Sequence, residues 1–166
     1  MPLKETLKKY KSKRNFSETS EPFSDKSTKK SNSKNKKKKP IFVIQEHNAS
    51  HLHWDFRLEL QGVLKSWAIP KKPPKQKNLK RLAIETEDHP LGYENFEGEI
   101  PEGNYGAGTV KIWDKGTYEL LEHKEGKKIE FILHGKELQG KYVLIKTNYG
   151  SNKEQKEKSW ILFRVG

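Results

Sequence analysis

The 166-residue sequence contains no cysteine. Disulfide bonds, thiolate zinc sites and cysteine nucleophiles are therefore excluded. The sequence also lacks any apolar run of about 20 residues, the length that a membrane-spanning helix needs. No apolar stretch follows the N-terminus, as an export signal would require. We therefore expect a cytoplasmic protein that does not act at a membrane.

Positive charge is concentrated near the N-terminus. Residues 1–40 contain 14 lysines and arginines against 4 acidic residues, so they carry +10 of the net charge of +12. The segment 27–40 is too polar and too self-repelling to form a core. We expect residues 1–40 to be a basic, largely disordered leader, which is either a solubilising linker or an arm that tethers the protein to DNA. Residues 41–166 should then form one domain.

Residues 41–166 contain short β-like runs separated by glycine, proline or asparagine, and no convincing amphipathic helix. The regular spacing of these runs favours a barrel or a sandwich. We predict an all-β fold, a small closed or partly open β-barrel of about eight strands. The expected strands are 41–45, 52–60, 63–69, 82–87, 109–113, 117–121, 128–133, 141–146 and 160–164. Hairpin turns are expected at 61–62, 114–116 and 125–126.

The segment 53–60 alternates polar and apolar residues with the period of two that a strand requires. Its large apolar residues fall on one face, namely Trp54, Phe56, Leu58 and Leu60. Its opposite face carries His53, Asp55, Arg57 and Glu59. One face therefore belongs to a core, and the other is available for chemistry.

His47 precedes this strand, and the turn-forming residues 48–50 can bring it back to His53 and Asp55. Two imidazoles and one carboxylate with open positions suit Mn²⁺, Fe²⁺ or Zn²⁺. The alternative is that these side chains form a polar, solvated rim of the barrel. Arg57 favours the metal, because its guanidinium is expected on the same face, where it can bind a phosphoester anion.

Residues 99–108 are rich in glycine, but they lack the lysine and the following helix of a P-loop. They also lack the strand-to-helix context of a dinucleotide-binding fingerprint. We interpret this segment as tight turns and a corner of the barrel, with a structural role.

Several ordered motifs can be read along the chain. They are 45–47 (QEH), 52–59 (LHWDFRLE), 64–71 (LKSWAIPK), 81–90 (RLAIETEDHP), 100–103 (IPEG), 105–108 (YGAG) and 113–114 (WD). In this order they closely resemble the 3′-phosphoesterase domain family of bacterial DNA ligase D and its stand-alone archaeal and bacterial relatives. The leader is similar too, at 10–14 (YKSKR) and 19–22 (TSEP), a family-like segment near 10–22. The resemblance covers nearly all of residues 41–166.

The resemblance implies a β-barrel that heals DNA 3′ ends. With Mn²⁺ it would remove 3′-phosphates and 3′-terminal ribonucleotides, leaving a 3′-hydroxyl for repair synthesis or ligation. Co²⁺ and Zn²⁺ are alternatives in the same site. The metal ligands implied are His47, His53 and Asp55, and the catalytic residues implied are Arg57, His89 and Tyr93. The supporting residues implied, which bind phosphate or orient other groups, are Gln45, Lys71, Arg81, Glu87 and Glu21.

The chain departs from the family pattern at two positions. Asn15 stands where relatives often carry aspartate, so a role for that acidic residue of the leader is not expected in this chain. His51 stands where arginine is common, so a DNA contact there becomes weaker or pH-dependent, and an additional metal ligand becomes conceivable. No ligase or polymerase domain is present in the sequence. We expect a monomer that acts on DNA primer–template 3′ ends, with any ligase and polymerase supplied in trans.

Two other functions stay open. A non-catalytic barrel that holds single-stranded nucleic acid by stacking predicts DNA affinity that is independent of Mn²⁺. A metal-dependent phosphodiesterase that acts on RNA or a small cyclic phosphate is separated from DNA repair only by comparing substrates.

Overall fold

The computed structural model describes residues 7–23 and 39–166. Within them, nine strands form one antiparallel sheet, accompanied by three short helical elements. The elements are α2 (Lys8–Ser12), β1 (Ile41–Asn48), β2 (Leu52–Leu60), β3 (Val63–Ile69), β4 (Arg81–His89), η2 (Tyr93–Asn95), β5 (Gly98–Ile100), β6 (Gly108–Lys124), β7 (Lys128–His134), β8 (Gln139–Lys146), α3 (Lys153–Lys158) and β9 (Ser159–Arg164). None of the helices in the described ranges is long and apolar enough to cross a lipid bilayer.

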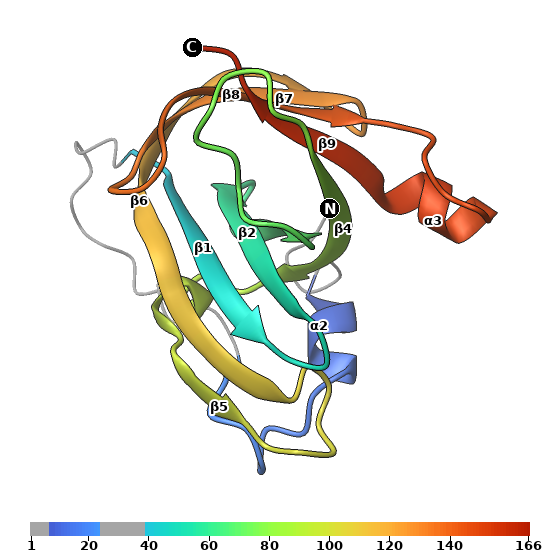
Figure 1. Cartoon of the computed structure of the whole chain (residues 1–166). Helices are drawn as coiled ribbons and strands as arrows, with labels where there is room; N and C mark the ends of the chain where they lie inside the picture. The colour runs from blue at the N-terminus through green and yellow to red at the C-terminus, as the bar shows by residue number, and fades with distance from the viewer. Residues whose placement is uncertain (1–6, 24–38) are drawn as a thin grey trace.

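The sheet closes into a barrel. The strand order is β1-β2-β3-β4-β9-β8-β7-β6-β5, and β1 also pairs with β6 (Figure 1). Eight strands therefore form the closed wall, and β5 is added at the edge of β6. The prediction of an all-β barrel of about eight strands is confirmed.

The barrel interior holds the main hydrophobic core. All eight wall strands contribute to it, because alternate residues of each strand point inward. Its largest side chains include Phe42, Phe56, Trp67, Phe131 and Tyr142, each 1% exposed or less. Burial of such a side chain contributes roughly 1.5–3 kcal/mol, so this core stabilises the wall on which the site is built.

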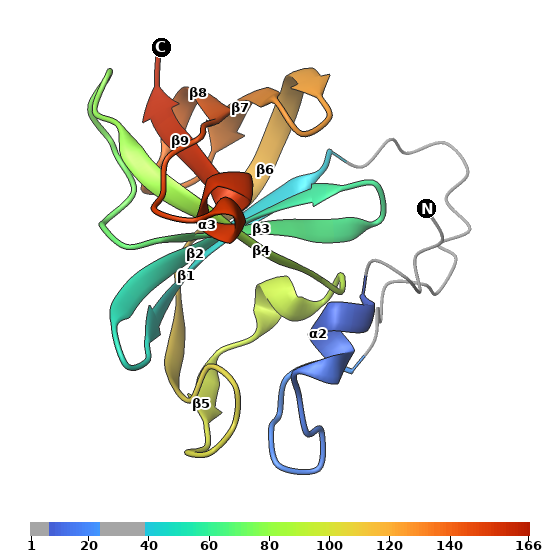
Figure 2. The same cartoon turned by 90° about the vertical axis from the view of Figure 1, so that its right-hand side faces the viewer.

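A second, smaller core lies on the outer face of the wall. It comprises Tyr10, Leu64, Tyr93, Phe96, Ile100 and Val110. These residues come from residues 7–23, from β3, from the connection between β4 and β6, and from β6. In both views α2 and β5 lie at the lower end of the molecule (Figures 1 and 2), where α2 contacts β4 and β5 pairs with β6. The Gln45 amide of β1 donates to the carbonyls of Tyr93 and Phe96, so the connection between β4 and β6 partly covers the outer face of β1.

Residues 7–23, hereafter the leader segment, are folded against the barrel. α2 contacts β4, and Tyr10 is fully buried with its ring against His89 and Tyr93. The Tyr10 hydroxyl donates a hydrogen bond to the carbonyl of Pro22, which ties the two ends of the segment together. Residues 1–40 were expected to be largely disordered; of these, residues 1–6 and 24–38 lie outside the described residues.

The hairpin turn predicted at 114–116 is not formed. β6 runs without interruption from Gly108 to Lys124 and changes partners, from β1 to β7, near Thr117. The Asp114 carboxylate accepts hydrogen bonds from the backbone N–H groups of Lys115, Lys136 and Leu138, so it caps the β7–β8 turn. A Cβ at Gly116 would lie 2.2 Å from the His134 carbonyl oxygen, so glycine permits close strand contact here.

Candidate metal and phosphate site

The candidate site lies on the outer face of the β1–β2 pair. The register places His47 opposite His53, Gln45 opposite Asp55, and Val43 opposite Arg57. Directly opposed residues on antiparallel strands point to the same face. The predicted alternation along 53–60 is therefore confirmed, with Trp54, Phe56 and Leu58 in the main core.

His47, His53 and Asp55 bring their ligand atoms within 4.8 Å of one another. Nδ1 of His47 lies 3.2 Å from one Asp55 carboxylate oxygen, and Nε2 of His53 lies 3.3 Å from the other. His47 and Asp55 are buried, and His53 is partly exposed. The three side chains form one group of nitrogen and oxygen donors, of the kind that first-row divalent metals bind.

Two backbone carbonyls set the orientation of the imidazoles. Nε2 of His47 lies 2.6 Å from the Gly106 carbonyl oxygen, and Nδ1 of His53 lies 3.0 Å from that of His51. When each carbonyl takes the N–H of a neutral ring, the other two nitrogens present their lone pairs on the Asp55 side. Lone pairs that converge with a carboxylate need a positive charge between them, so these residues fit a divalent metal ion.

The ionisation of Asp55 also favours a bound metal ion. Burial alone would raise the pKa of Asp55, but the adjacent imidazoles of His47 and His53 and the charge of Arg57 lower it below its usual range. Burial opposes charge on His53, yet the neighbouring Asp55 carboxylate raises the pKa of this imidazole. The carboxylate is thus ionised and favours a cation beside it.

Arg57 is buried, and Gln45 and Ser66 hold its guanidinium in place. Its Nε donates to Gln45 Oε1 at 2.7 Å, and its Nη1 donates to Ser66 Oγ at 2.8 Å. The amide nitrogen of Gln45 in turn donates to the carbonyls of Tyr93 and Phe96. Nη2 lies 3.6 Å from Asp55, so the guanidinium is directed at the metal-ligand group. An anion bound between them would meet a fixed positive charge.

His89 lies on the other side of Arg57 and is 3% exposed. Its Nδ1 lies 2.9 Å from the Glu87 carbonyl oxygen, and its Nε2 lies 3.2 Å from Nη2 of Arg14. Nδ1 also lies 3.1 Å from Nη1 of Arg57, so each ring nitrogen faces a guanidinium donor, and these contacts fit a neutral ring. Burial, followed by the charges of Arg57 and Arg14, holds the pKa of His89 well below its usual value.

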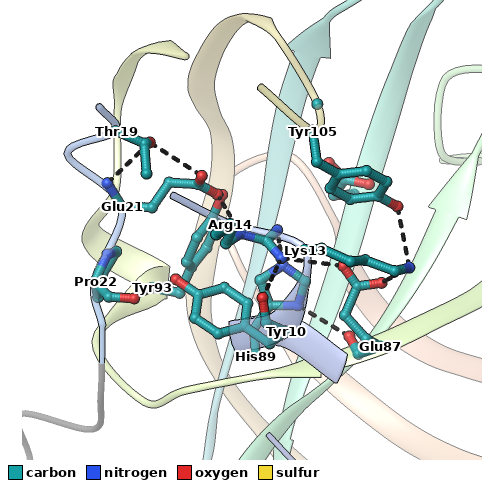
Figure 3. Close-up of polar contacts among 12 residues, drawn as sticks. Tyr10, Lys13, Arg14, Thr19, Glu21, Pro22, Glu87, His89, Tyr93 and Tyr105 are labelled. Atoms are coloured by element: carbon teal, nitrogen blue, oxygen red, sulfur yellow. Dashed lines mark hydrogen bonds and ion pairs between the residues drawn. The ribbon is translucent and has the colours of Figure 1, made fainter. Parts of the chain in front are cut away.

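The leader segment supplies polar groups to the same site (Figure 3). Glu21 is 5% exposed and accepts hydrogen bonds from Tyr93 Oη, from Arg14 Nε at 2.9 Å and from Thr19 Oγ1 at 3.0 Å. Burial raises the pKa of Tyr93, so its hydroxyl remains a hydrogen-bond donor. The position of Glu21 in the site was implied by the resemblance, whereas the motifs did not single out Arg14.

Glu87 joins the leader segment to β4. It accepts from Lys13 Nζ at 3.0 Å and lies 3.3 Å from Arg14 Nη1 (Figure 3). Burial acts to raise the pKa of Glu87, but hydrogen bonds and the charges of Lys13 and Arg14 lower it below the usual value. Glu87 is therefore a buried carboxylate that anchors two cations of the leader segment.

These groups border one cavity of about 350 Å³. The residues of the proposed site that line it are Glu21, His47, His53, Asp55, Arg57, Glu87, His89 and Tyr93. Gln45 is fully buried behind Arg57. Lys71 and Arg81 do not line the cavity in the described residues; Lys71 is exposed, and Arg81 Nε donates to the Lys72 carbonyl. Their contact with a substrate stays a prediction.

The two family departures have local roles in the structure. Asn15 contacts Glu18 and Ser17 within the leader segment, and it does not border the cavity in the described residues. His51 has an exposed side chain, and only its carbonyl contacts His53. The glycine-rich segment has a closer connection to the site than expected, since both Tyr105 and Gly106 line the cavity. Glycine content alone gave no sign that a carbonyl of this segment contacts His47.

Comparison with known proteins identifies the family. Residues 45–146 match the model described as DNA ligase D 3′-phosphoesterase domain. The chain is 44% identical over 169 residues to the multifunctional non-homologous end joining protein LigD of Pseudomonas aeruginosa, covering 99% of this chain and 19% of that protein. It is 46% identical over 156 residues to the LigD of Mycobacterium tuberculosis, covering 89% of this chain and 19% of that protein. The chain thus spans about a fifth of the length of these relatives. It belongs to the DNA ligase D 3′-phosphoesterase domain family.

Proposed function

We propose that this protein is a metal-dependent phosphoesterase that processes DNA 3′ ends. It removes 3′-phosphates and 3′-terminal ribonucleotides and leaves a 3′-hydroxyl. The observation that carries this proposal is the convergence of His47, His53 and Asp55 with the buried guanidinium of Arg57 in one cavity. Membership of the family supports the same reaction class.

The metal ligands are His47, His53 and Asp55, and the proposed ion is Mn²⁺, with Co²⁺ or Zn²⁺ as alternatives for this donor set. When bound, the ion neutralises charge on the phosphoryl oxygens and lowers the pKa of bound water. The fixed imidazole orientations mean that little reorganisation is needed when the ion binds.

Arg57 binds a non-bridging oxygen of the phosphoryl group. Gln45 and Ser66 hold its guanidinium in place, so the positive charge is already positioned before the substrate arrives. Gln45 therefore acts as a positioning residue, through Arg57. Tyr93 lies under the same guanidinium, with Cζ of Arg57 4.8 Å from the ring centroid, and its hydroxyl is oriented by Glu21.

His89 borders the position of the phosphoryl group and is neutral in its present surroundings. A phosphate dianion beside Arg14 and Arg57 offsets the two charges that disfavour a proton on this ring. His89 can then take up a proton and either donate it to the departing O3′ or hold the phosphate as a cation. The proposal includes both of these roles for His89.

The proposed biological setting is end processing in non-homologous end joining. The two relatives are named as non-homologous end joining proteins, and this chain matches about a fifth of each. We propose that a ligase and a polymerase act with it in trans, and that it works as a monomer on primer–template ends.

The test uses a 5′-labelled primer–template with a 3′-phosphate, with and without Mn²⁺, beside a His47→Ala control. The proposal predicts that the phosphate is released only with metal and intact His47. A parallel substrate ends in one ribonucleotide, and an all-RNA duplex and a cyclic phosphate test the alternative substrates. A DNA end that is bound but unchanged would contradict the proposal and favour a non-catalytic nucleic-acid-binding barrel. Cleavage of only the RNA or only the cyclic phosphate would favour a phosphodiesterase that acts on those substrates.

A further inference from the structure

Tyr105 is an exposed aromatic side chain at the edge of the candidate site. It lines the same cavity as the metal ligands, and 47% of its surface is exposed. Among the described residues of the cavity wall it is the only large aromatic with such exposure, since Tyr93 is 2% exposed. In the part of the chain that the structure describes, this ring is therefore accessible to a ligand.

The backbone of Tyr105 is tied to the metal-ligand group. The next residue, Gly106, has its carbonyl oxygen 2.6 Å from Nε2 of His47. The turn around Tyr105 is closed by a hydrogen bond from the Ala107 N–H to the Asn104 carbonyl, at 3.1 Å. The ring is therefore carried by a turn whose position relative to His47 is fixed by a direct contact.

Two cations of the leader segment border the ring (Figure 3). Lys13 Nζ lies 4.7 Å from the ring centroid, and Arg14 Cζ lies 5.5 Å from it. The Lys13 side chain is 39% exposed, and its ammonium is shared with Glu87. An aromatic face beside exposed positive charge is the combination that proteins use to hold the bases and phosphates of nucleic-acid strands.

We propose that Tyr105 is a substrate-binding residue that stacks against the base of the terminal nucleotide while its 3′-phosphate occupies the metal site. This inference rests on the proposed function and names the part of the substrate that the site recognises. It gives the site a preference for nucleic-acid ends over phosphoesters that carry no base. Stacking of one base is worth about 1–3 kcal/mol by alanine substitution, or roughly 5- to 150-fold in affinity.

A purely structural role of Tyr105 would have a different effect on the KM values of the substrates. If the ring served only to hold Lys13 and Arg14, its removal would loosen the leader segment and affect every substrate equally. Stacking instead requires that the effect depends on the presence of a base. The experiment therefore compares two primer–templates with a 3′-phosphate, one with 2-aminopurine as the terminal base and one with an abasic terminal nucleotide.

The variants are Tyr105→Ala, Tyr105→Phe and, as a matched control, Tyr149→Ala. Tyr149 is 67% exposed and does not line this cavity. We expect Tyr105→Ala to raise the KM for the base-bearing end about tenfold or more and to leave the KM for the abasic end unchanged. Tyr105→Phe keeps the ring and should keep the difference in KM between the two ends, whereas Tyr149→Ala lies elsewhere and should behave as the wild type. An equal rise for both ends, or no rise for either, would overturn the inference.

A binding measurement separates this inference from the proposed function. Stacking on tyrosine quenches 2-aminopurine fluorescence, and quenching is observed whether or not the phosphate is released. If the wild type releases no phosphate, the proposed function fails, while quenching that is lost in Tyr105→Ala still supports stacking. Quenching that is identical in the wild type and Tyr105→Ala would rule stacking out.

Discussion

The backbone carbonyl of Gly106 lies 2.6 Å from Nε2 of His47 and determines which nitrogen of that ring faces Asp55. Nδ1 of His47 is thereby directed at the Asp55 carboxylate, 3.2 Å away. A group outside the ligand set thus orients a metal ligand, as neighbouring carbonyls commonly do in metal sites.

Gly106→Ala should weaken metal binding. Gly106 has φ of +76°, and a Cβ there would lie 3.2 Å from Cε1 of His47, so the imidazole must shift. We expect an affinity loss of about 10- to 100-fold for Mn²⁺, the range seen when groups that orient metal ligands are altered. Isothermal titration calorimetry with Mn²⁺ measures it.

Gly103→Ala is the matched control for this prediction. Gly103 has φ of +86°, but a Cβ there meets no atom within 4 Å. Both variants should lose stability because alanine is strained at positive φ, by about 1 kcal/mol. Only Gly106→Ala should lose metal affinity. Equal Mn²⁺ affinity in both variants would show that the Gly106 contact does not support His47.

Removal of a metal ligand and removal of Arg57 should have separable effects. His53→Ala and Asp55→Ala should abolish activity and lose Mn²⁺ affinity by more than about 100-fold. Arg57→Ala should retain the metal and lose affinity for phosphate, because its guanidinium is beside the ligands without being one of them. Metal titrations followed by phosphate titrations of the three variants check this. Undiminished metal binding by Asp55→Ala would refute the ligand assignment.

The buried, neutral His89 should make folding stability depend on pH. Its pKa in the folded chain is well below the 6.5 of an exposed histidine, mainly because of burial. Below about pH 6.5 the unfolded chain binds a proton that the folded chain excludes, so acid favours unfolding. This contribution is fully present above pH 6.5 and is lost as the pH falls, with a slope of at most about 1.4 kcal/mol per pH unit.

Urea unfolding of the wild type and of His89→Gln, repeated across this pH range, isolates the contribution. His53 titrates with the opposite sign because its pKa is raised, so the difference between the two proteins is the informative quantity. That difference should shrink as the pH is lowered. A difference that is constant with pH would mean that folding leaves the pKa of His89 unchanged and would contradict this prediction.

Tyr10→Ala should release the leader segment without unfolding the barrel. Tyr10 is fully buried in the small outer core, which shares no residues with the barrel interior. We expect docking of the leader segment to weaken by about 3 kcal/mol, as for other buried aromatics. Trypsin should then cleave at Arg14, which is buried in the wild type, while the circular dichroism of the barrel persists.

Tyr10→Phe serves as the control for leader release. It keeps the ring against His89 and Tyr93 and loses only the hydrogen bond to Pro22, so it should cost about 1 kcal/mol. Trypsin cleavage at Arg14 should stay close to that of the wild type. Unfolding of the entire chain by Tyr10→Ala would contradict the separation of the two cores.

The prediction from sequence succeeded where residues close in the chain define the geometry. His47, His53, Asp55 and Arg57 lie on two paired strands joined by a short turn, so the period of two places them on one face. Gly106 and the leader cations come from distant segments, and their approach depends on tertiary packing that no local pattern encodes. The turn predicted at 114–116 was wrong because Asp114 caps the β7–β8 turn within a continuous strand.

We propose that the ion held by His47, His53 and Asp55 is the one used to release the 3′-phosphate. The most direct test titrates Mn²⁺ while bound metal and phosphate release are followed in the same samples, for the wild type and Asp55→Asn. We expect phosphate release and occupancy of one Mn²⁺ site to reach half of their maxima at the same Mn²⁺ concentration, and Asp55→Asn to lose both. Phosphate release that persists in EDTA, or in Asp55→Asn with the site empty, would contradict this proposal.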